Sequence, residues 1–214
     1  MAKIKAVLFD MDGVLIDAKD WHYEALNKAL GLFGMTISRY DHLVTYDGLP
    51  TKKKLQMLTL ERGLPTGLHE FINDIKQQYT MEIVYARCKP RFQHQYALAQ
   101  LKKAGYRIAV CSNSIRQSIE IMMEKAALSE YLSCIVSNEE ITHPKPDPEG
   151  YLKCMQELGL QPEECLILED NEKGIRAALA SGGHLMRIDT VEDVHLQAIM
   201  DSIEQAEHST RRPQ

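Results

Sequence analysis

Two patterns that alternate in the second half of the chain constrain its fold more than any other feature. Strand-length segments rich in apolar residues lie at 106–111, 134–136, 165–168 and 184–188. Before and between them, apolar residues recur at helical spacing, at about 92–104, 115–127, 148–158 and 172–181. Continuous apolar runs are typical of strands buried on both faces, and strands separated by helices pair in parallel. This half of the chain therefore predicts a parallel sheet with helices on both faces.

A further buried strand is predicted at the beginning of the chain, where an apolar run starts at Ile4. Two carboxylates, Asp10 and Asp12, follow this run directly, and the chain then turns at Gly13. Because ligands of open α/β sheets bind at the carboxyl ends of the strands, this acid pair is a candidate site. The turn can direct one acid at a substrate and hold the other aside. A solvated turn at a strand end is the alternative.

The segment between this strand and the alternating half contains only helical periodicity. Helices are predicted at about 19–33, 51–62 and 66–83. Successive helices without an intervening strand can bury their apolar faces against one another. We therefore predict an α/β protein with a Rossmann-like parallel sheet core, at 1–16 and 89–214, and an inserted helical-bundle cap at 17–88. The final ten or so residues, including 208–214, are polar and are expected to be frayed.

Composition excludes several classes of protein. The net charge of the 214 residues is −5 and the basic residues are scattered, so neither a nucleic-acid groove nor a membrane surface is expected as a partner. No apolar segment has the length of a signal peptide or a membrane span, and the expected location is the cytoplasm. The five cysteines show no CxxC spacing, which favours reduced core thiols over disulfides or a zinc site.

The other strand ends carry polar groups of complementary chemistry. Ser112 and Asn113 follow one strand, Lys145 lies between two prolines in a later loop, and Glu169 and Asp170 end another strand. A parallel sheet brings these ends to one edge, together with the acids of the first strand. Carboxylates suit a hard cation such as Mg²⁺, while a hydroxyl, backbone amides and an ammonium suit phosphate oxygens. The set predicts magnesium-dependent phosphoryl transfer, with a solvated loop lysine as the alternative for Lys145.

Four motifs carry a resemblance to a known family. They are Asp10-Met11-Asp12-Gly13-Val14, Ser112-Asn113-Ser114, Lys145-Pro146-Asp147-Pro148 and Glu169-Asp170-Asn171-Glu172-Lys173-Gly174. In this order and spacing they resemble the signature motifs of the haloacid dehalogenase superfamily. The inserted helices resemble the small helical cap of its subgroup containing phosphoglycolate phosphatase and β-phosphoglucomutase. The resemblance spans nearly the whole chain.

The resemblance implies a role for each acid. Asp10 would be the nucleophile that forms an aspartyl-phosphate and would also bind Mg²⁺. Asp12 would be the general acid and base, and its backbone carbonyl would bind the metal. Asp170 would complete the metal site. Glu169 would either contact the metal or its waters, or accept hydrogen bonds beside them.

The remaining roles concern the substrate. Ser112, the amide of Asn113 and the ammonium of Lys145 would hold the phosphoryl oxygens. In the cap, His22 lies where β-phosphoglucomutase also has a histidine, and Lys52 could reach an anionic substrate. A half-buried helical histidine and a solvated helix start are the alternatives. The segment 49–51 reads Leu-Pro-Thr where the mutase has an arginine that grips a second phosphate, which argues against mutase activity.

The predicted function is hydrolysis of a small phosphorylated metabolite by a monomer or weak homodimer. A β-phosphoglucomutase-type mutase is the first alternative, and a phosphate-binding regulatory module without turnover is the second. A dehalogenase or phosphonatase is disfavoured, because such relatives resemble enzymes that lack an acid at the position of Asp12.

Overall fold

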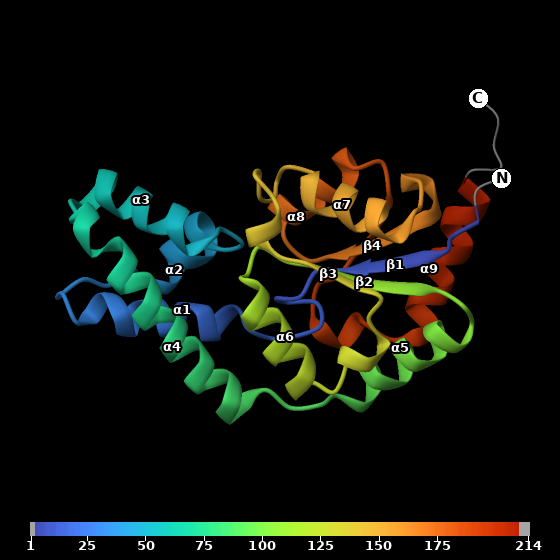
Figure 1. Cartoon of the computed structure of the whole chain (residues 1–214), viewed down its shortest axis with the longest axis horizontal. Helices are drawn as coiled ribbons and strands as arrows, with labels where there is room; N and C mark the ends of the chain where they lie inside the picture. The colour runs from blue at the N-terminus through green and yellow to red at the C-terminus, as the bar shows by residue number, and fades with distance from the viewer. Residues whose placement is uncertain (1–2, 210–214) are drawn as a thin grey trace. The chain divides into compact units, whose positions relative to one another are not determined.

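The structure of the chain, a computed structural model, describes residues 3–209. Five parallel strands form one sheet in the order β3-β2-β1-β4-β5 (Figure 1). The strands are β1 (Ala6–Phe9), β2 (Arg107–Cys111), β3 (Cys134–Val136), β4 (Cys165–Glu169) and β5 (His184–Arg187). Every residue of β1 and β4 is buried, because strands at the centre of a parallel sheet are covered on both faces. The predicted α/β fold is confirmed.

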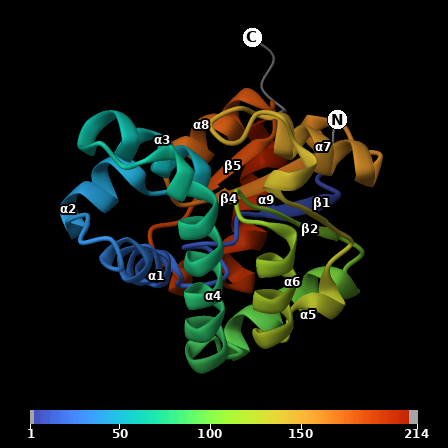
Figure 2. The same cartoon turned by 60° about the vertical axis from the view of Figure 1, so that its left-hand side comes forward.

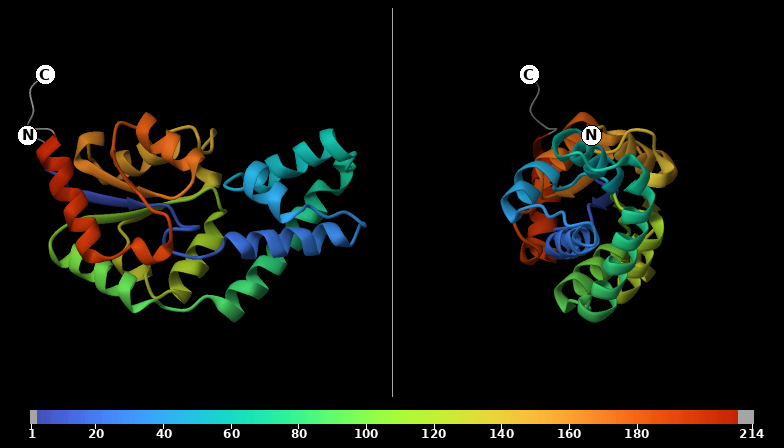
Figure 3. Two further views of the ribbon diagram at one scale, coloured as in Figure 1. Left: turned by 180° about the vertical axis from the view of Figure 1, so that it is seen from behind. Right: turned by 90° about the vertical axis from the view of Figure 1, so that its left-hand side faces the viewer.

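Five long helices flank the sheet. They are α5 (Phe92–Lys103), α6 (Arg116–Lys125), α7 (Glu149–Leu158), α8 (Glu172–Ala180) and α9 (Leu196–Ser209). Helices α7 and α8 cover one face, while α5, α6 and α9 cover the other (Figures 1 and 3). Short 3₁₀ turns occur at Ser129–Tyr131, Asn138–Glu140, Pro162–Glu164 and Val191–Asp193. This arrangement confirms the alternation of strands and helices predicted for the second half of the chain.

Helix α9 was not predicted, and the expectation of a frayed end is wrong as far as Ser209. The helix buries Ile199, Ile203 and Ala206, which recur at helical spacing within a polar sequence. Glu207 also accepts a hydrogen bond from the backbone amide of Ile4 at 3.0 Å. The last part of the expectation, on 210–214, lies outside the described residues.

The chain divides into two compact units. The core unit ends at Asp17 and resumes at Lys89, and the cap unit consists of Ala18–Cys88. The cap unit contains α1 (Lys19–Gly31), α3 (Thr51–Arg62) and α4 (His69–Arg87), the helices expected from periodicity (Figure 2). It also contains α2 (Arg39–Asp41), a π-helix at His42–Tyr46 and a 3₁₀ turn at Thr66–Leu68, which were not predicted. Its helices share a buried cluster that includes Leu26, Leu30, Leu55, Leu58 and Ile72.

Two expectations from composition can be compared with the structure. All five cysteines are free thiols; Cys134 is half-buried and the others are buried, as predicted. Within residues 3–209, the helices lack an apolar stretch long enough to cross a bilayer.

Candidate active site

The predicted site residues of the core unit converge at the carboxyl edge of the sheet. Strand β1 lies between β2 and β4, with Phe9 in register with Val110 and Leu168. Asp10 follows β1 and continues its pairing, because its amide donates to the Leu168 carbonyl at 3.0 Å. Neighbouring strands that end in polar residues therefore bring those residues together, as the sequence predicted.

A tight turn after β1 separates the two acids of the first motif. The carbonyl of Met11 accepts hydrogen bonds from the amides of Leu15 and Ile16 at 3.0 and 2.9 Å, and Gly13 has a φ of 92°. A residue with a side chain rarely adopts this φ, so the turn requires glycine. Asp10 is only 5% exposed, whereas Asp12 is half-buried. The two carboxylates therefore have different surroundings, as different chemical roles require.

Lys145 connects several groups of the site through hydrogen bonds. Its buried ammonium donates to Asp10 Oδ1 and Glu169 Oε1 at 2.7 Å, to the Cys111 carbonyl at 2.8 Å and to Tyr151 Oη at 2.9 Å. Burial alone lowers the pKa of Lys145, but the carboxylates of Asp10 and Glu169 outweigh burial and hold that pKa above its usual value. The lysine is therefore a fixed positive charge beside Asp10, and the alternative of a solvated loop lysine is wrong.

A cluster of three carboxylates can hold a divalent cation. Asp10, Glu169 and Asp170 each offer one oxygen, and these oxygens lie within 4.8 Å of one another. Burial raises the pKa of Asp10 well above its usual value, and the charge of Glu169 raises it further, although Lys145 lowers it. A bound cation would relieve this crowding of negative charge. The donors fit Mg²⁺, which prefers oxygen ligands and binds through few carboxylates.

Helix α8 begins against the Glu169 carboxylate. Asn171 caps the helix by accepting hydrogen bonds from the amides of Lys173 and Gly174, both at 3.1 Å. A Cβ atom on Gly174 would lie 2.0 Å from Oε1 of Glu169. Glycine is therefore required here by close packing against the acid.

The second motif contacts both the acid pair and the lysine loop. Ser112 is buried, and its Oγ accepts a hydrogen bond from the amide of Ser114 at 3.1 Å. Ser114 Oγ donates to Asp12 Oδ2 at 3.2 Å, and Asn113 Oδ1 accepts from the amide of Lys145 at 3.2 Å. The structure thus places Ser112 and Asn113 at the site, as predicted, and adds a contact of Ser114 with Asp12.

Helix α7 follows the lysine loop. Pro148 is its N-cap residue, and Asp147 Oδ1 accepts a hydrogen bond from the Glu149 amide at 3.0 Å. Sequence analysis missed Tyr151, whose hydroxyl contacts Lys145 and Glu169. Its place on the apolar face of α7 suggests a core aromatic residue, and no sequence pattern distinguishes a tyrosine that only packs in the core from one whose hydroxyl also contacts the site.

Within the cap unit, the predicted residues differ in surroundings. His22 on α1 is half-buried, and its Nδ1 lies 3.3 Å from Nζ of Lys76 on α4. Lys52 is exposed, whereas Lys54 in the same run is only 7% exposed. The neighbouring His42 is buried, and burial, followed by the charge of Lys54, lowers its pKa to about 4. Of the three lysines at 52–54, Lys54 alone is buried.

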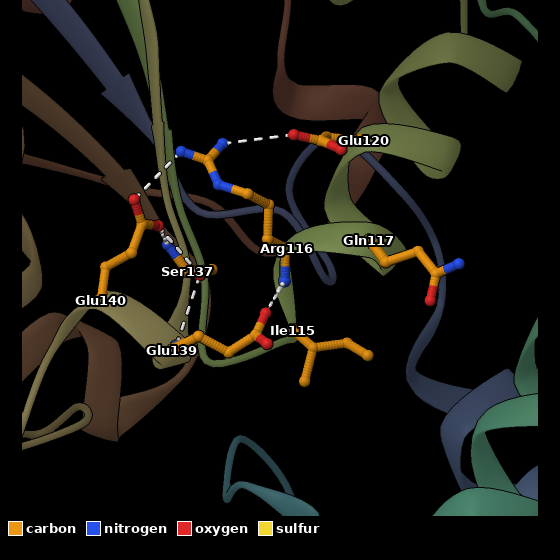
Figure 4. Close-up of a pocket in the computed structure, with 7 residues that line it drawn as sticks. All are labelled: Ile115, Arg116, Gln117, Glu120, Ser137, Glu139 and Glu140. Atoms are coloured by element: carbon orange, nitrogen blue, oxygen red, sulfur yellow. Dashed lines mark hydrogen bonds and ion pairs between the residues drawn. The ribbon is translucent and has the colours of Figure 1, made fainter.

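A hollow of about 400 Å³ lies on the surface of the core unit (Figure 4). Its lining is Ile115, Arg116, Gln117, Glu120, Ser137, Glu139 and Glu140. The Arg116 guanidinium pairs with Glu140 at 3.0 Å and Glu120 at 3.3 Å, and Glu139 accepts from the Arg116 amide at 2.6 Å. These acids stabilise the local fold, and none of the predicted site residues lines the hollow.

Comparison with known proteins agrees with this geometry. A family model described as haloacid dehalogenase-like hydrolase matches residues 7–188. The phosphoglycolate phosphatase of Aquifex aeolicus is 29% identical over 179 residues, 84% of this chain and 82% of that protein. The fructose-1-phosphate phosphatase YqaB of Escherichia coli is 28% identical over 181 residues, 82% of this chain and 92% of that protein.

A similar fold is found among solved structures. A β-phosphoglucomutase from Clostridium difficile has a TM-score of 0.83 at 18% identity, over 96% of this chain and 99% of that chain. At this identity the likeness concerns the fold alone. The match to the family model extends over most of the chain and agrees with the four motifs. The chain therefore belongs to the haloacid dehalogenase-like hydrolases.

Proposed function

We propose that this protein is a magnesium-dependent phosphatase that hydrolyses a small phosphomonoester through an aspartyl-phosphate on Asp10. Family membership makes the chain a hydrolase, and relatives named as phosphatases indicate phosphoric monoesters as the substrate class. One observation carries the proposal: the Asp10 carboxylate lies 2.7 Å from a buried ammonium, beside two further carboxylates that fit Mg²⁺. A regulatory module without turnover would have no use for this arrangement.

The reaction has two steps, and the chain's own side chains carry both. An oxygen of Asp10 attacks phosphorus while Asp12 gives a proton to the leaving oxygen, so the phosphoryl group passes to Asp10. Asp12 then takes a proton from water, which attacks the aspartyl-phosphate and releases inorganic phosphate. When bound by Asp10, Asp170 and the Asp12 carbonyl, with Glu169 nearby, Mg²⁺ offsets the negative charge of the phosphoryl oxygens.

The phosphoryl group must be held in line with Asp10. Ser112, the amide of Asn113 and the Lys145 ammonium are proposed to bind its oxygens and to offset the charge that the nucleophile and substrate bring together. In the cap, contacts of His22 and Lys52 with the substrate stay a prediction, as do the domains at 1–16 and 89–214 (core) and at 17–88 (cap). A cytoplasmic location and a monomer or weak homodimer also stay predictions.

We expect activity to require Mg²⁺ and to be lost on chelation, because carboxylates crowded around the nucleophile need a cation before a phosphate dianion can approach. Ca²⁺ should inhibit, because its larger and looser coordination lets Asp10 bind the ion in a way that prevents the attack of its carboxylate on phosphorus. The measurement is phosphate release from a panel of phosphorylated metabolites, with Mg²⁺, with Ca²⁺ and with excess EDTA. Full turnover in EDTA would contradict the metal assignment.

We also expect hydrolysis rather than interconversion of sugar phosphates. A mutase must hold a bisphosphate while it reorients, and the segment 49–51 offers no guanidinium to clamp the second phosphate. Water should therefore reach the aspartyl-phosphate first. The test follows glucose 1-phosphate by phosphorus NMR with Mg²⁺ and a bisphosphate primer. Inorganic phosphate from this or another monoester supports the hydrolase, whereas formation of the 6-phosphate that outpaces phosphate release would show a mutase.

A further inference from the structure

Tyr151 is a buried residue of the site to which the reaction described above assigns no task. It lies on α7 with no exposed surface, in the core cluster that also contains Cys111 and Cys154. Its hydroxyl contacts two charged groups of the site: Oη lies 2.9 Å from Nζ of Lys145 and forms a hydrogen bond with Oε1 of Glu169. A buried tyrosine hydroxyl needs a hydrogen-bond partner, and here both partners are charged groups of the site.

The chemistry of the three groups sets the direction of each hydrogen bond. An ionised carboxylate only accepts and an ammonium only donates. Tyr151 must therefore donate its single proton to Glu169 and accept from Lys145.

The ammonium of Lys145 has fewer N–H groups than it has neighbouring oxygen acceptors. It has three N–H groups, and four oxygens lie between 2.7 and 2.9 Å from Nζ. Glu169 Oε1 receives hydrogen bonds from both Lys145 and Tyr151. The proton that Tyr151 donates therefore supplies Glu169 with a second hydrogen bond, so Glu169 does not depend on Lys145 alone and an N–H group of Lys145 can stay directed at Asp10.

Packing keeps the Tyr151 ring in place. A Cβ atom on the preceding Gly150 would lie 2.7 Å from Sγ of Cys111, so α7 sits tightly against β2. The Lys145 ammonium also lies 4.6 Å from the centre of the Tyr151 ring, within the range of a cation–π contact. The hydroxyl thus comes from a rigid helix rather than from a loop.

We propose that Tyr151 is a positioning residue, which holds the Glu169 carboxylate and the Lys145 ammonium so that the lysine remains directed at Asp10. The inference rests on the proposed phosphatase function and adds a residue to it. Tyr151 does not touch the reacting atoms; it acts through Lys145 and Glu169.

The test is Tyr151→Phe, which removes only the hydroxyl. We expect kcat to fall about tenfold at saturating Mg²⁺ while KM changes less than about twofold, because the lysine is misdirected after substrate has bound. Tyr131→Phe is the matched control, since Tyr131 is a half-buried tyrosine of the core unit outside the site. Circular dichroism melts define a temperature at which all variants are folded, and rates are compared there.

A double-mutant cycle tests whether the effect passes through Glu169. In the Glu169→Gln background, Tyr151→Phe should change kcat by less than about twofold, because the carboxylate that the hydroxyl serves is gone. An unchanged kcat for the single variant, or the same tenfold loss in both backgrounds, would overturn the inference. Wild-type turnover distinguishes the two proposals: an inactive wild type overturns the phosphatase and this inference together, whereas an active wild type matched by Tyr151→Phe overturns this inference alone.

Discussion

Asp10→Asn is expected to abolish turnover and to leave the fold intact. The amide has nearly the shape of the carboxylate, and its oxygen can still accept a hydrogen bond from Lys145, which lies 2.7 Å from Asp10 Oδ1. It cannot attack phosphorus, so no aspartyl-phosphate forms. Removing one charge from the group of Asp10, Glu169 and Asp170 also relieves repulsion. The melting temperature without metal should therefore be unchanged or higher.

Asp12→Asn is the matched comparison for this prediction. It should slow turnover by about 10²–10⁴-fold, the usual contribution of general acid–base catalysis, because the amide cannot transfer a proton. Phosphate release is measured for both variants with Mg²⁺, and circular dichroism melts confirm folding. A near-normal rate for Asp10→Asn would show that another residue is the nucleophile. Equal residual rates for the two variants would leave no distinction between their roles.

Lys145→Met is expected to damage both stability and catalysis. Methionine fills much of the volume of the lysine but removes the charge, so Asp10 and Glu169 are left buried without their cation. Breaking a buried ion pair by removal of one partner costs about 3–5 kcal/mol of the free energy of unfolding. Activity should fall by about 10²–10³-fold or more, as for the loss of a group that stabilises charge in the transition state.

Two measurements test this second prediction. Urea unfolding without metal gives the loss of stability, and added Mg²⁺ should restore about 2.7 kcal/mol when its concentration is 100 times its Kd, because it binds the carboxylates of Asp10 and Glu169 only in the folded state. The control is Lys153→Met on α7, where the half-buried lysine donates to the Glu140 carbonyl at 3.0 Å and the expected cost is about 1 kcal/mol. Wild-type stability and kcat in Lys145→Met would contradict the role of Lys145 as the buried cation that pairs with Asp10 and Glu169.

The sequence by itself determined the sheet and the location of the site. Buried parallel strands require continuous apolar runs, so β1, β2, β3 and β4 could be predicted from local composition. Because such strands end at one edge, the polar residues that follow them had to converge, as Asp10, Ser112 and Glu169 do. The ends of two predicted helices also depend on local residues, since Gly63 ends α3 and Asn171 begins α8.

Only the tertiary structure decided which side chains contact one another inside that site. Tyr151 reaches Lys145 and Glu169 because α7 packs against β2, and that approach depends on residues far apart in the chain. The same holds for α9, whose few apolar residues pack into the core, and for the burial of Lys54 two residues after the exposed Lys52. Periodicity predicts which face of an element is buried, but burial of a particular polar group depends on partners that local sequence does not specify.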